Sequence, residues 1–456
     1  MKQTKNPLLY KTPVKTDKTT KAETAKRALV ENIKKDFDER RILRNDQEQQ
    51  WQLNMEFFNG NQNYNSGGRQ FHWQQREVFN HIASMVEARL ARITSGTQTP
   101  DTDNTSTLCE KILESTFAKL DFDNLASQAA QWSEVCGTVF YKVLWNAEAG
   151  RVLGYTENGK PIHQGEIGVV VASPFEIYPD RMTATDMGDV TSLIHAREMT
   201  THSIMEKWGI DVSGDEGKTS ALVLERYEVP TAKHPNGRLT IVAGSVLLFD
   251  GELPFVNGAD GTRTIPFIRQ VSENNIGAFF GKSVVTRAIP VQRAYNAVKN
   301  RKTEFMNRLA CGVLIAEEGS VDLESLEDEG LAPGKVITYK QGTTPPKFLE
   351  TGVFPAELDR EEERLLREFE NIVGASAFPR PSDASNASGI ALDILAQKDR
   401  LRISRTIAEF IGARRNIGAH ILRLYKQFAI QPRLEHTMNA DGQIEMFTFT
   451  SNDIGG

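Results

Sequence analysis

The chain has 456 residues, of which 39% are apolar and 25% charged, and its formal net charge is −6. This length and apolar content suffice for more than one core, so we expect two to four domains or lobes. The negative charge argues against a protein that wraps nucleic acid over its whole surface, and no apolar run is long enough to cross a membrane. The three cysteines lie far apart without CxxC spacing, which is typical of reduced structural thiols in a cytosolic compartment.

Positive charge is concentrated at the N-terminus. The first 27 residues hold eight Lys or Arg against Asp17 and Glu23. Such a segment is either a solvated, disordered tail or an arm that contacts a neighbouring molecule or nucleic-acid phosphate.

Helical periodicity dominates the first third of the chain. Apolar residues such as Ile33 and Phe37 recur at helical spacing from Lys21 to Gly60. A second helix is predicted over residues 76–93. After a polar stretch, a third helical region is predicted to end near Cys136.

The middle third predicts strands, because β-branched and aromatic runs alternate there with Gly, Pro and Asp. The runs are CGTVFYKVLW, EIGVVVASPFEIYPD, SLIHAREMT and TIPFIRQVSENN. Residues 224–251 read as a β-hairpin whose turn is His234-Pro235-Asn236-Gly237.

The last third returns to helices. One helix is predicted from Ser283 to Leu309 and another from Glu357 to Val373. Between them lies a small insert with two strand-like runs, CGVLIAEEG and GKVITYKQG. Gly374 begins a polar, proline-bearing segment, and a helical pattern resumes from Ile390 to Ala429.

The sequence predicts no catalytic residue, cofactor or metal site. GAFFGKS has three residues between its glycines where a phosphate-binding P-loop needs four, so a helix start near Ser283 is preferred. There is no HExxH pair, Cys/His cluster or GxSxG elbow. The acidic pairs Asp101/Asp103 and Asp121/Asp123 are the candidates for a magnesium site, although such residues more often cap turns and helices.

The order of these segments resembles the portal proteins of tailed bacteriophages. The segments that carry the resemblance are Trp51 to Gly60, REVFNHI (76–82), CGTVFYKVLW, SPFEIYPD (173–180) and FGKS (280–283) with Gln292 and Asn296 downstream. The similarity covers about residue 45 to the end of the chain.

The resemblance implies an α+β portal fold with a mixed wing domain, a long helical stem, a small α/β clip, a tunnel loop and a long wing helix, and with a short or absent crown. The implied segments are a basic N-terminal arm, partly disordered (1–45), the wing (46–282), a first stem helix (283–310), the clip (311–356), a second stem helix (357–373), the tunnel loop (374–388), the long wing helix (389–430) and a C-terminal segment towards a crown (431–456).

The same resemblance implies a non-enzymatic protein of the virion, assembled in the host cytoplasm. It would form a ring, usually of twelve copies, at a unique capsid vertex, as the conduit for packaging and ejection of double-stranded DNA. Its partners would be the major capsid and scaffolding proteins, the terminase motor and tail adaptor proteins, with no membrane. The alternatives are a nuclease with a cryptic metal site and a scaffold or adaptor protein that never contacts DNA.

Three groups of site residues follow from this mapping. The DNA-facing tunnel loop would use Ser376, Phe378, Arg380, Ser382, Asp383, Ser385, Asn386 and Ser388; Phe378 is either a packing residue or a tip that touches DNA. The clip would dock the motor and adaptors through Glu324, Glu327, Asp328 and Glu329. The stem helices carry opposite charges, which either pair within or between subunits or stay solvated separately. The stem residues are Arg301, Lys302, Arg308, Glu361, Glu362 and Glu363.

Overall fold

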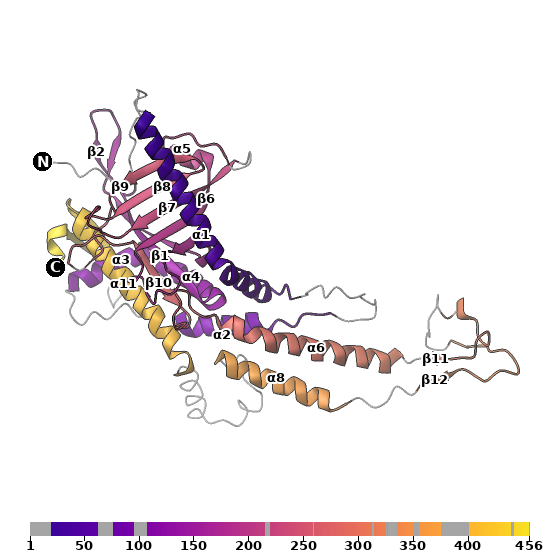
Figure 1. The fold of residues 1–456 in the computed structure, drawn as a ribbon. Coiled ribbons are helices and arrows are strands. Elements are labelled where there is room, and N and C mark those ends of the chain that lie inside the picture. The colour runs from indigo at the N-terminus through magenta and orange to yellow at the C-terminus, as the bar shows by residue number, and fades with distance from the viewer. Residues whose placement is uncertain are drawn as a thin grey trace. The chain divides into compact units, whose positions relative to one another are not determined.

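The computed structural model describes residues 20–62, 76–94, 107–214, 219–258, 260–311, 314–324, 326, 335–349, 355–374, 401–438 and 442–455. The chain divides into two compact units (Figure 1). Unit 1 comprises residues 1–55, 86–286 and 378–456, and unit 2 comprises residues 56–85 and 287–377.

Unit 1 contains two antiparallel sheets. The five-stranded sheet has the order β5-β6-β7-β8-β9, with strands Ile177–Pro179, Ser192–Thr200, Ser220–Glu228, Arg238–Ala243 and Val246–Gly251. The three-stranded sheet has the order β10-β1-β4, with strands Phe267–Val271, Thr138–Asn146 and Glu166–Ala172. The hairpin predicted over residues 224–251 is confirmed as β7 and β8, which are joined through the predicted turn and followed by β9.

Helices cover the sheets in layers (Figure 1). The long helix α1 (Thr20–Phe58) lies on the five-stranded sheet, where Val30, Ile33 and Phe37 are buried. The three-stranded sheet packs against α3 (Thr107–Lys119), α4 (Phe122–Cys136) and α11 (Ser404–Phe428). Helix α2 (His81–Thr94) begins in unit 2 and continues into unit 1 from Val86. Smaller elements of unit 1 are α5 (Thr201–Trp208), the β2–β3 hairpin (Val152–Tyr155 and Pro161–His163) and two 3₁₀ turns (Pro174–Glu176 and Ser451–Asp453).

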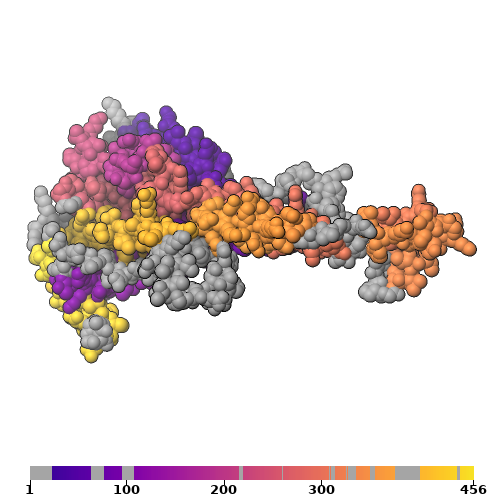
Figure 2. Space-filling model, turned by 90° about the horizontal axis from the view of Figure 1, so that it is seen from below, coloured from indigo at the N-terminus to yellow at the C-terminus, as the bar shows by residue number. Residues whose placement is uncertain are grey.

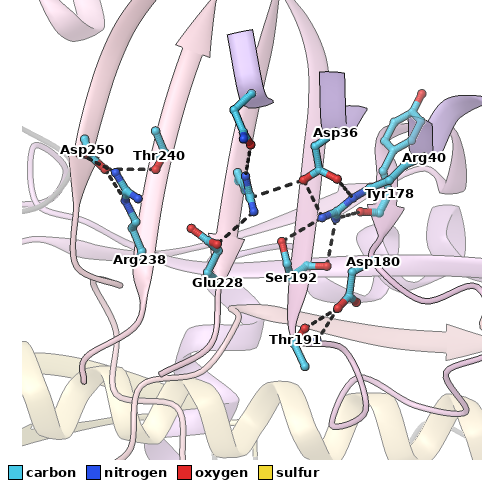
Figure 3. Close-up of polar contacts among 12 residues, drawn as sticks. Asp36, Arg40, Tyr178, Asp180, Thr191, Ser192, Glu228, Arg238, Thr240 and Asp250 are labelled. Carbon is cyan, nitrogen blue, oxygen red and sulfur yellow. Dashed lines mark hydrogen bonds and ion pairs between the residues drawn. The ribbon is translucent and has the colours of Figure 1, made fainter. Parts of the chain in front are cut away.

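Arginines fix α1 on its sheet (Figure 3). Arg40 donates to the backbone oxygens of Tyr178 and Ser192 at 3.0 and 3.1 Å, while Asp36 holds the same guanidinium at 2.8 Å. Arg44 donates to the carbonyl of Ile177 at 2.7 Å. The helix predicted from Lys21 to Gly60 is confirmed as α1. The segment boundary expected at residue 45 lies within this helix.

Strand β1 is buried on both faces because it lies between the helices and the second sheet. Val139, Tyr141 and Val143 contribute to the core that α3, α4 and α11 complete. On the opposite face, Lys142 pairs with the buried Glu225 of β7, which also accepts a hydrogen bond from the Tyr227 hydroxyl at 2.7 Å. The charges between the sheets are thus paired, as burial requires.

Glu134 of α4 joins segments that are distant in the sequence. Its carboxylate is fully buried, pairs with Arg89 of α2 and accepts from the Ser272 hydroxyl at 2.6 Å. The Thr406 hydroxyl, at the start of α11, donates to the Ser272 carbonyl at 2.9 Å. One buried carboxylate therefore sets the relative positions of α2, α4, the end of β10 and α11.

Unit 2 is organised on α6 (Val284–Cys311), which begins in unit 1, and on α8 (Glu357–Val373). The insert between these helices holds the two-stranded pair β11 (Leu314–Ile315) and β12 (Lys347–Phe348). The predicted bounds of the second helix, Glu357–Val373, are confirmed.

The helix predicted over residues 76–93 was wrong at its start, because α2 begins at His81. Residues 76–80 have no regular secondary structure and lie along α6. The backbone N–H groups of Glu77, Phe79 and His81 donate to Asn300, Asn296 and Gln292 at 3.1, 3.1 and 3.0 Å. Two residues of extended chain advance about 6.6 Å and four residues of helix about 6 Å, so this amide ladder matches both repeats.

Two further expectations need correction, and one pair of strands was not predicted. The third helical region is two helices, α3 and α4, because Asp121 between them has a left-handed backbone with φ 46°. GKVITYKQG supplies only an isolated bridge from Tyr339 to Val321, and the partner of β11 is Lys347–Phe348. Strands β13 (Arg433–Met438) and β14 (Ile444–Phe449) pair antiparallel, and the sequence had predicted no strands there. The start of the long wing helix lies outside the described residues, and α11 ends at Phe428 near the predicted end.

Replacing Glu134 by Gln should lower the free energy of unfolding by about 3–5 kcal/mol, because it removes the charge of a fully buried carboxylate that pairs with the buried Arg89 guanidinium. The control Ser272→Ala removes only one hydrogen bond and should cost about 1 kcal/mol. Urea unfolding monitored by circular dichroism measures both values. Equal losses of unfolding free energy in the two variants would contradict the conclusion that the Glu134 carboxylate joins these segments.

Candidate functional site

The charged pair of helices α6 and α8 forms the best-defined candidate site. Three residues of α6, at helical spacing, face one carboxylate of α8, that of Glu362. Lys299 and Lys302 donate to Glu362 at 2.6 and 2.9 Å, and the Tyr295 hydroxyl donates at 3.2 Å. Lys302 also pairs with Asp359, one turn earlier on α8. Of the opposite charges predicted on the stem helices, Lys302 and Glu362 are brought together within one subunit.

An apolar stripe continues this contact along α8. Leu365, Phe369 and Val373 are buried and follow Glu362 at helical spacing. The ring of His81 lies edge-on to Tyr295 at 4.5 Å and tilted against Phe369 at 6.0 Å. The two helices are therefore joined by a polar contact at one level, and beside it His81 at the start of α2 contacts an aromatic ring of each helix.

The environment of Glu362 favours its charged form. Burial raises the pKa of this carboxyl, but the hydrogen bonds from Lys299 and Lys302 outweigh burial, and the pKa lies below its usual range. Burial, with the adjacent Glu362 carboxylate, raises the pKa of Tyr295 to about 12. Hydrogen bonds to Asp359 and Glu362 raise the pKa of Lys302. At neutral pH, Glu362 is therefore ionised, Tyr295 is neutral and Lys302 is protonated.

The other predicted stem charges point elsewhere. Glu361 pairs with Arg364 at 2.6 Å and Glu363 with Arg367 at 3.5 Å, both on α8 itself. Glu361 is partly exposed, and the other three side chains are largely exposed. Arg301 is exposed, and the side chain of Arg308 lies outside the described structure. The surface of α8, orange in Figure 2, thus carries acidic side chains paired with their own helical neighbours.

Little of the predicted tunnel loop and clip sites falls on described residues. Gly374 ends α8 with φ 72°, and its N–H donates to the Glu370 carbonyl at 3.0 Å. The predicted loop residues from Ser376 to Ser388 lie outside the described residues, as do Glu327, Asp328 and Glu329 of the clip. Glu324 is described and is exposed.

The C-terminal hairpin β13–β14 has a polar inner face and an apolar outer face. Arg433, Glu435 and Thr437 of β13 are buried. Glu435 accepts from Lys119 of α3 at 2.5 Å, and Thr437 donates to Glu114 at 2.8 Å. Glu435 and Thr437 are therefore held by α3, and Arg433 pairs with Glu166 of β4 at 2.9 Å.

The outer face of the hairpin exposes large apolar side chains. Met438 stands opposite Ile444, and both are more than two-thirds exposed, at 69% and 68%. Met446 (67%) and Leu434 (59%) extend the same face. The hairpin, yellow beside α3 in purple, lies at the surface in Figure 2. Such a patch on an isolated pair of strands is typical of an interaction surface. Only the alternation RLEHTM indicates it in the sequence, and it does not say which face is buried.

Among the described residues, no group of three or more His, Cys, Asp or Glu is arranged to hold a metal ion. Within the same part of the chain, no helix has the length and apolar character of a membrane span.

Replacing Glu362 by Gln should destabilise the α6–α8 pair by about 1–2 kcal/mol, since three donors lose a charged acceptor that is partly screened by solvent. The matched control is Glu363→Gln on the exposed side of α8, which should change stability by less than about 0.5 kcal/mol. Hydrogen exchange of the α8 amides reports both changes.

The same experiment has a pH dependence. Because the folded pKa of Glu362 is depressed, its contribution is fully present above the ordinary value of 4.5 and is lost as the pH falls through the folded pKa. The difference between wild type and Glu362→Gln should therefore shrink on acidification below about pH 4.5. A difference that stays constant down to the lowest pH would contradict an ionised Glu362 at this contact.

Comparison with known protein families identifies the family to which this chain belongs. The family model of the phage P22-like portal protein matches residues 223–455, just over half of the chain. The matched range includes α6, α8, α11 and the C-terminal hairpin. No curated protein matches the chain. The resemblance seen in the sequence is thus confirmed, and the chain belongs to the phage P22-like portal protein family.

Proposed function

We propose that copies of this chain assemble into a ring, of twelve subunits as is typical of portals, at one vertex of the phage capsid. Double-stranded DNA would pass through this ring during packaging and ejection. The observation that carries the proposal is family membership over residues 223–455, a range that holds both long helices of unit 2.

The α6–α8 pair suits the wall of a DNA channel. The Glu362 contact and the aromatic packing beside it hold the two helices together within one subunit. The acidic side chains of α8 repel phosphate if this helix faces the channel. A channel through which DNA slides needs few tight phosphate contacts, since each one adds affinity and salt dependence.

Two parts of the proposal concern the loop and the clip. The segment 374–388 begins at the end of α8, and its serines, Asn386 and Arg380 would contact passing DNA through weak, exchangeable hydrogen bonds. The acidic clip residues Glu324, Glu327, Asp328 and Glu329 would bind basic surfaces of the terminase motor and, later, of tail adaptors. Capsid and scaffolding proteins would contact the ring at the vertex.

The apolar outer face of the β13–β14 hairpin supports self-assembly. Met438 and Met446 are flexible apolar residues that adapt to a partner surface, and both are largely exposed in the single subunit. We assign this face to the contact between neighbouring subunits of the ring.

Electron microscopy of the purified, concentrated protein tests the ring. Rings with an axial hole wide enough for duplex DNA are expected, and Met438→Lys with Met446→Lys should reduce their number because lysines are costly to bury at a contact. The control Glu157→Lys, on the exposed turn of the β2–β3 hairpin, should assemble normally.

Two results would favour the alternatives. Oligomers that lack an axial hole would favour a scaffold or adaptor protein. Cleavage of duplex DNA that requires Mg²⁺, without ring formation, would favour a nuclease.

Reversing Glu324, Glu327, Asp328 and Glu329 to Lys should weaken binding of the terminase motor at least tenfold while the rings stay intact. Binding of the phage's own terminase to immobilised rings measures the loss, and Glu157→Lys again serves as the control. Unchanged terminase binding to the reversed rings would exclude the acidic clip as the docking surface.

A further inference from the structure

A cavity of about 560 Å³ lies in unit 1 between α11, strand β10 and the loop before β6. Its volume falls in the range of small-molecule pockets, which measure about 300–1,000 Å³. One part of the lining is apolar and buried, and it consists of Val190, Ile265, Phe267 and Ile268. The polar lining residues of α11 are Glu409, Asn416, His420 and Arg423. An apolar wall with a few polar groups is the usual composition of a ligand site.

The polar lining residues of α11 lie along one face of the helix. Asn416, His420 and Arg423 are spaced by four and three residues, which places them in successive turns on the same side. Glu409 precedes Asn416 by two turns and shares this face. The helix advances about 21 Å from Glu409 to Arg423, so the cavity is elongated and has a different charged residue of α11 at each end.

The charged groups at the Glu409 end already have partners. Glu409 accepts a hydrogen bond from the Asn274 amide at 3.0 Å. Asp186 accepts from a backbone N–H of its own turn at 2.7 Å. Arg269 donates to the Thr185 carbonyl at 2.6 Å, and the charges of Glu409 and Asp186 counter the effect of burial on the pKa of this arginine. This end of the cavity is therefore balanced in charge.

The Arg423 end carries positive charge without an acidic partner. The Arg423 side chain is partly buried and donates to the Asn257 carbonyl, but no carboxylate of the described residues forms an ion pair with it. Nδ1 of His420 is buried and, within the same part of the chain, has no hydrogen-bond partner. Buried polar atoms of native proteins are almost always hydrogen-bonded, so a missing partner indicates a water, an ion or a ligand.

Both groups at this end can donate hydrogen bonds to an anion. Burial and the charge of Arg423 lower the pKa of His420 to about 4, so the imidazole is neutral at neutral pH and keeps one N–H. The guanidinium of Arg423 gives one N–H to Asn257 and has others left. A carboxylate or sulfonate accepts strong, charge-assisted hydrogen bonds from a guanidinium. An inorganic ion would leave the apolar wall uncovered, whereas an organic anion would cover it.

We propose that this cavity binds a small organic anion, whose carboxylate or sulfonate is held by Arg423 and His420. The apolar body of the ligand packs against the wall that contains Phe267 and Ile268. The bound molecule thereby joins α11, β10 and the loop before β6, which are distant in the sequence. This inference rests on unit 1 alone and does not depend on ring formation.

Fluorescence titration of the full chain with 8-anilinonaphthalene-1-sulfonate tests the proposal, because this dye combines an aromatic body with one sulfonate. Saturable binding to one site per subunit is expected. Arg423→Gln should weaken this binding at least tenfold, because the sulfonate loses its charged donor. The matched control Arg415→Gln removes an exposed charge of the same helix, outside the cavity lining, and should leave binding unchanged.

A second variant tests the cavity without changing a charge. Ala419 of α11 lines the cavity, so Ala419→Phe fills it and should abolish dye binding, whereas Ala419→Ser should not. This pair decides the question if Arg423→Gln does not fold, which circular dichroism shows. N-phenyl-1-naphthylamine has the rings of the dye without its sulfonate and should bind wild type at least tenfold more weakly.

Each other result overturns the proposal. Absence of saturable binding means that water alone fills the cavity. Binding that survives in Arg423→Gln or in Ala419→Phe means that the dye binds elsewhere. Binding that is lost in Met438→Lys with Met446→Lys assigns the dye to the C-terminal hairpin. Equal binding of the neutral analogue means that the protein does not recognise the anionic group.

Discussion

The carboxylate of Glu362 is the contact on which the helical part of this portal protein depends. Tyr295, Lys299 and Lys302 of α6 converge on it from successive turns. Helices rich in surface charge rarely associate through exposed ion pairs, which contribute about 0–1 kcal/mol each. A half-buried acceptor with three donors, continued by the Phe369 packing, provides a joint that surface pairs alone do not. Glu361 and Glu363 of α8 instead pair with Arg364 and Arg367 of the same helix.

Unit 1 follows the same principle with more deeply buried groups. Glu134 pairs with Arg89, and Glu225 pairs with Lys142, so each buried charge meets a partner from a distant segment. These polar contacts define unique positions for the helices and sheets, while the apolar cores supply most of the stabilisation. The C-terminal hairpin extends the pattern, because its polar face pairs with α3 and β4 while its apolar face is exposed.

Local patterns predicted much of the fold. Helical periodicity gave α1, α6 and α8 nearly to the residue, because each carries an apolar stripe and ends at a glycine or a polar segment. Strand content and the β7–β8 turn followed from β-branched runs and the Asn-Gly signal. The order of these elements was sufficient to indicate the family.

The features that were not predicted correctly depend on residues that are distant in the sequence. Residues 76–80 resemble a helix start, but Asn296 and Asn300, more than 200 positions later, bind their backbone in another conformation. The polar face of β13 is buried because Lys119 and Glu114 of α3 and Glu166 of β4 pair with it. For the same reason, opposite charges on two helices did not show in advance that Glu362, and not Glu361 or Glu363, joins them. The predicted tunnel loop and most of the clip acids stay predictions.

An electron cryomicroscopy map of the assembled protein would show where α6 and α8 lie. We expect a ring in which α6 and α8 of each subunit run together along the DNA channel, with Lys299 and Glu362 in contact within the subunit. A ring whose channel is lined by other elements, or in which α8 pairs with α6 of a neighbour, would contradict it.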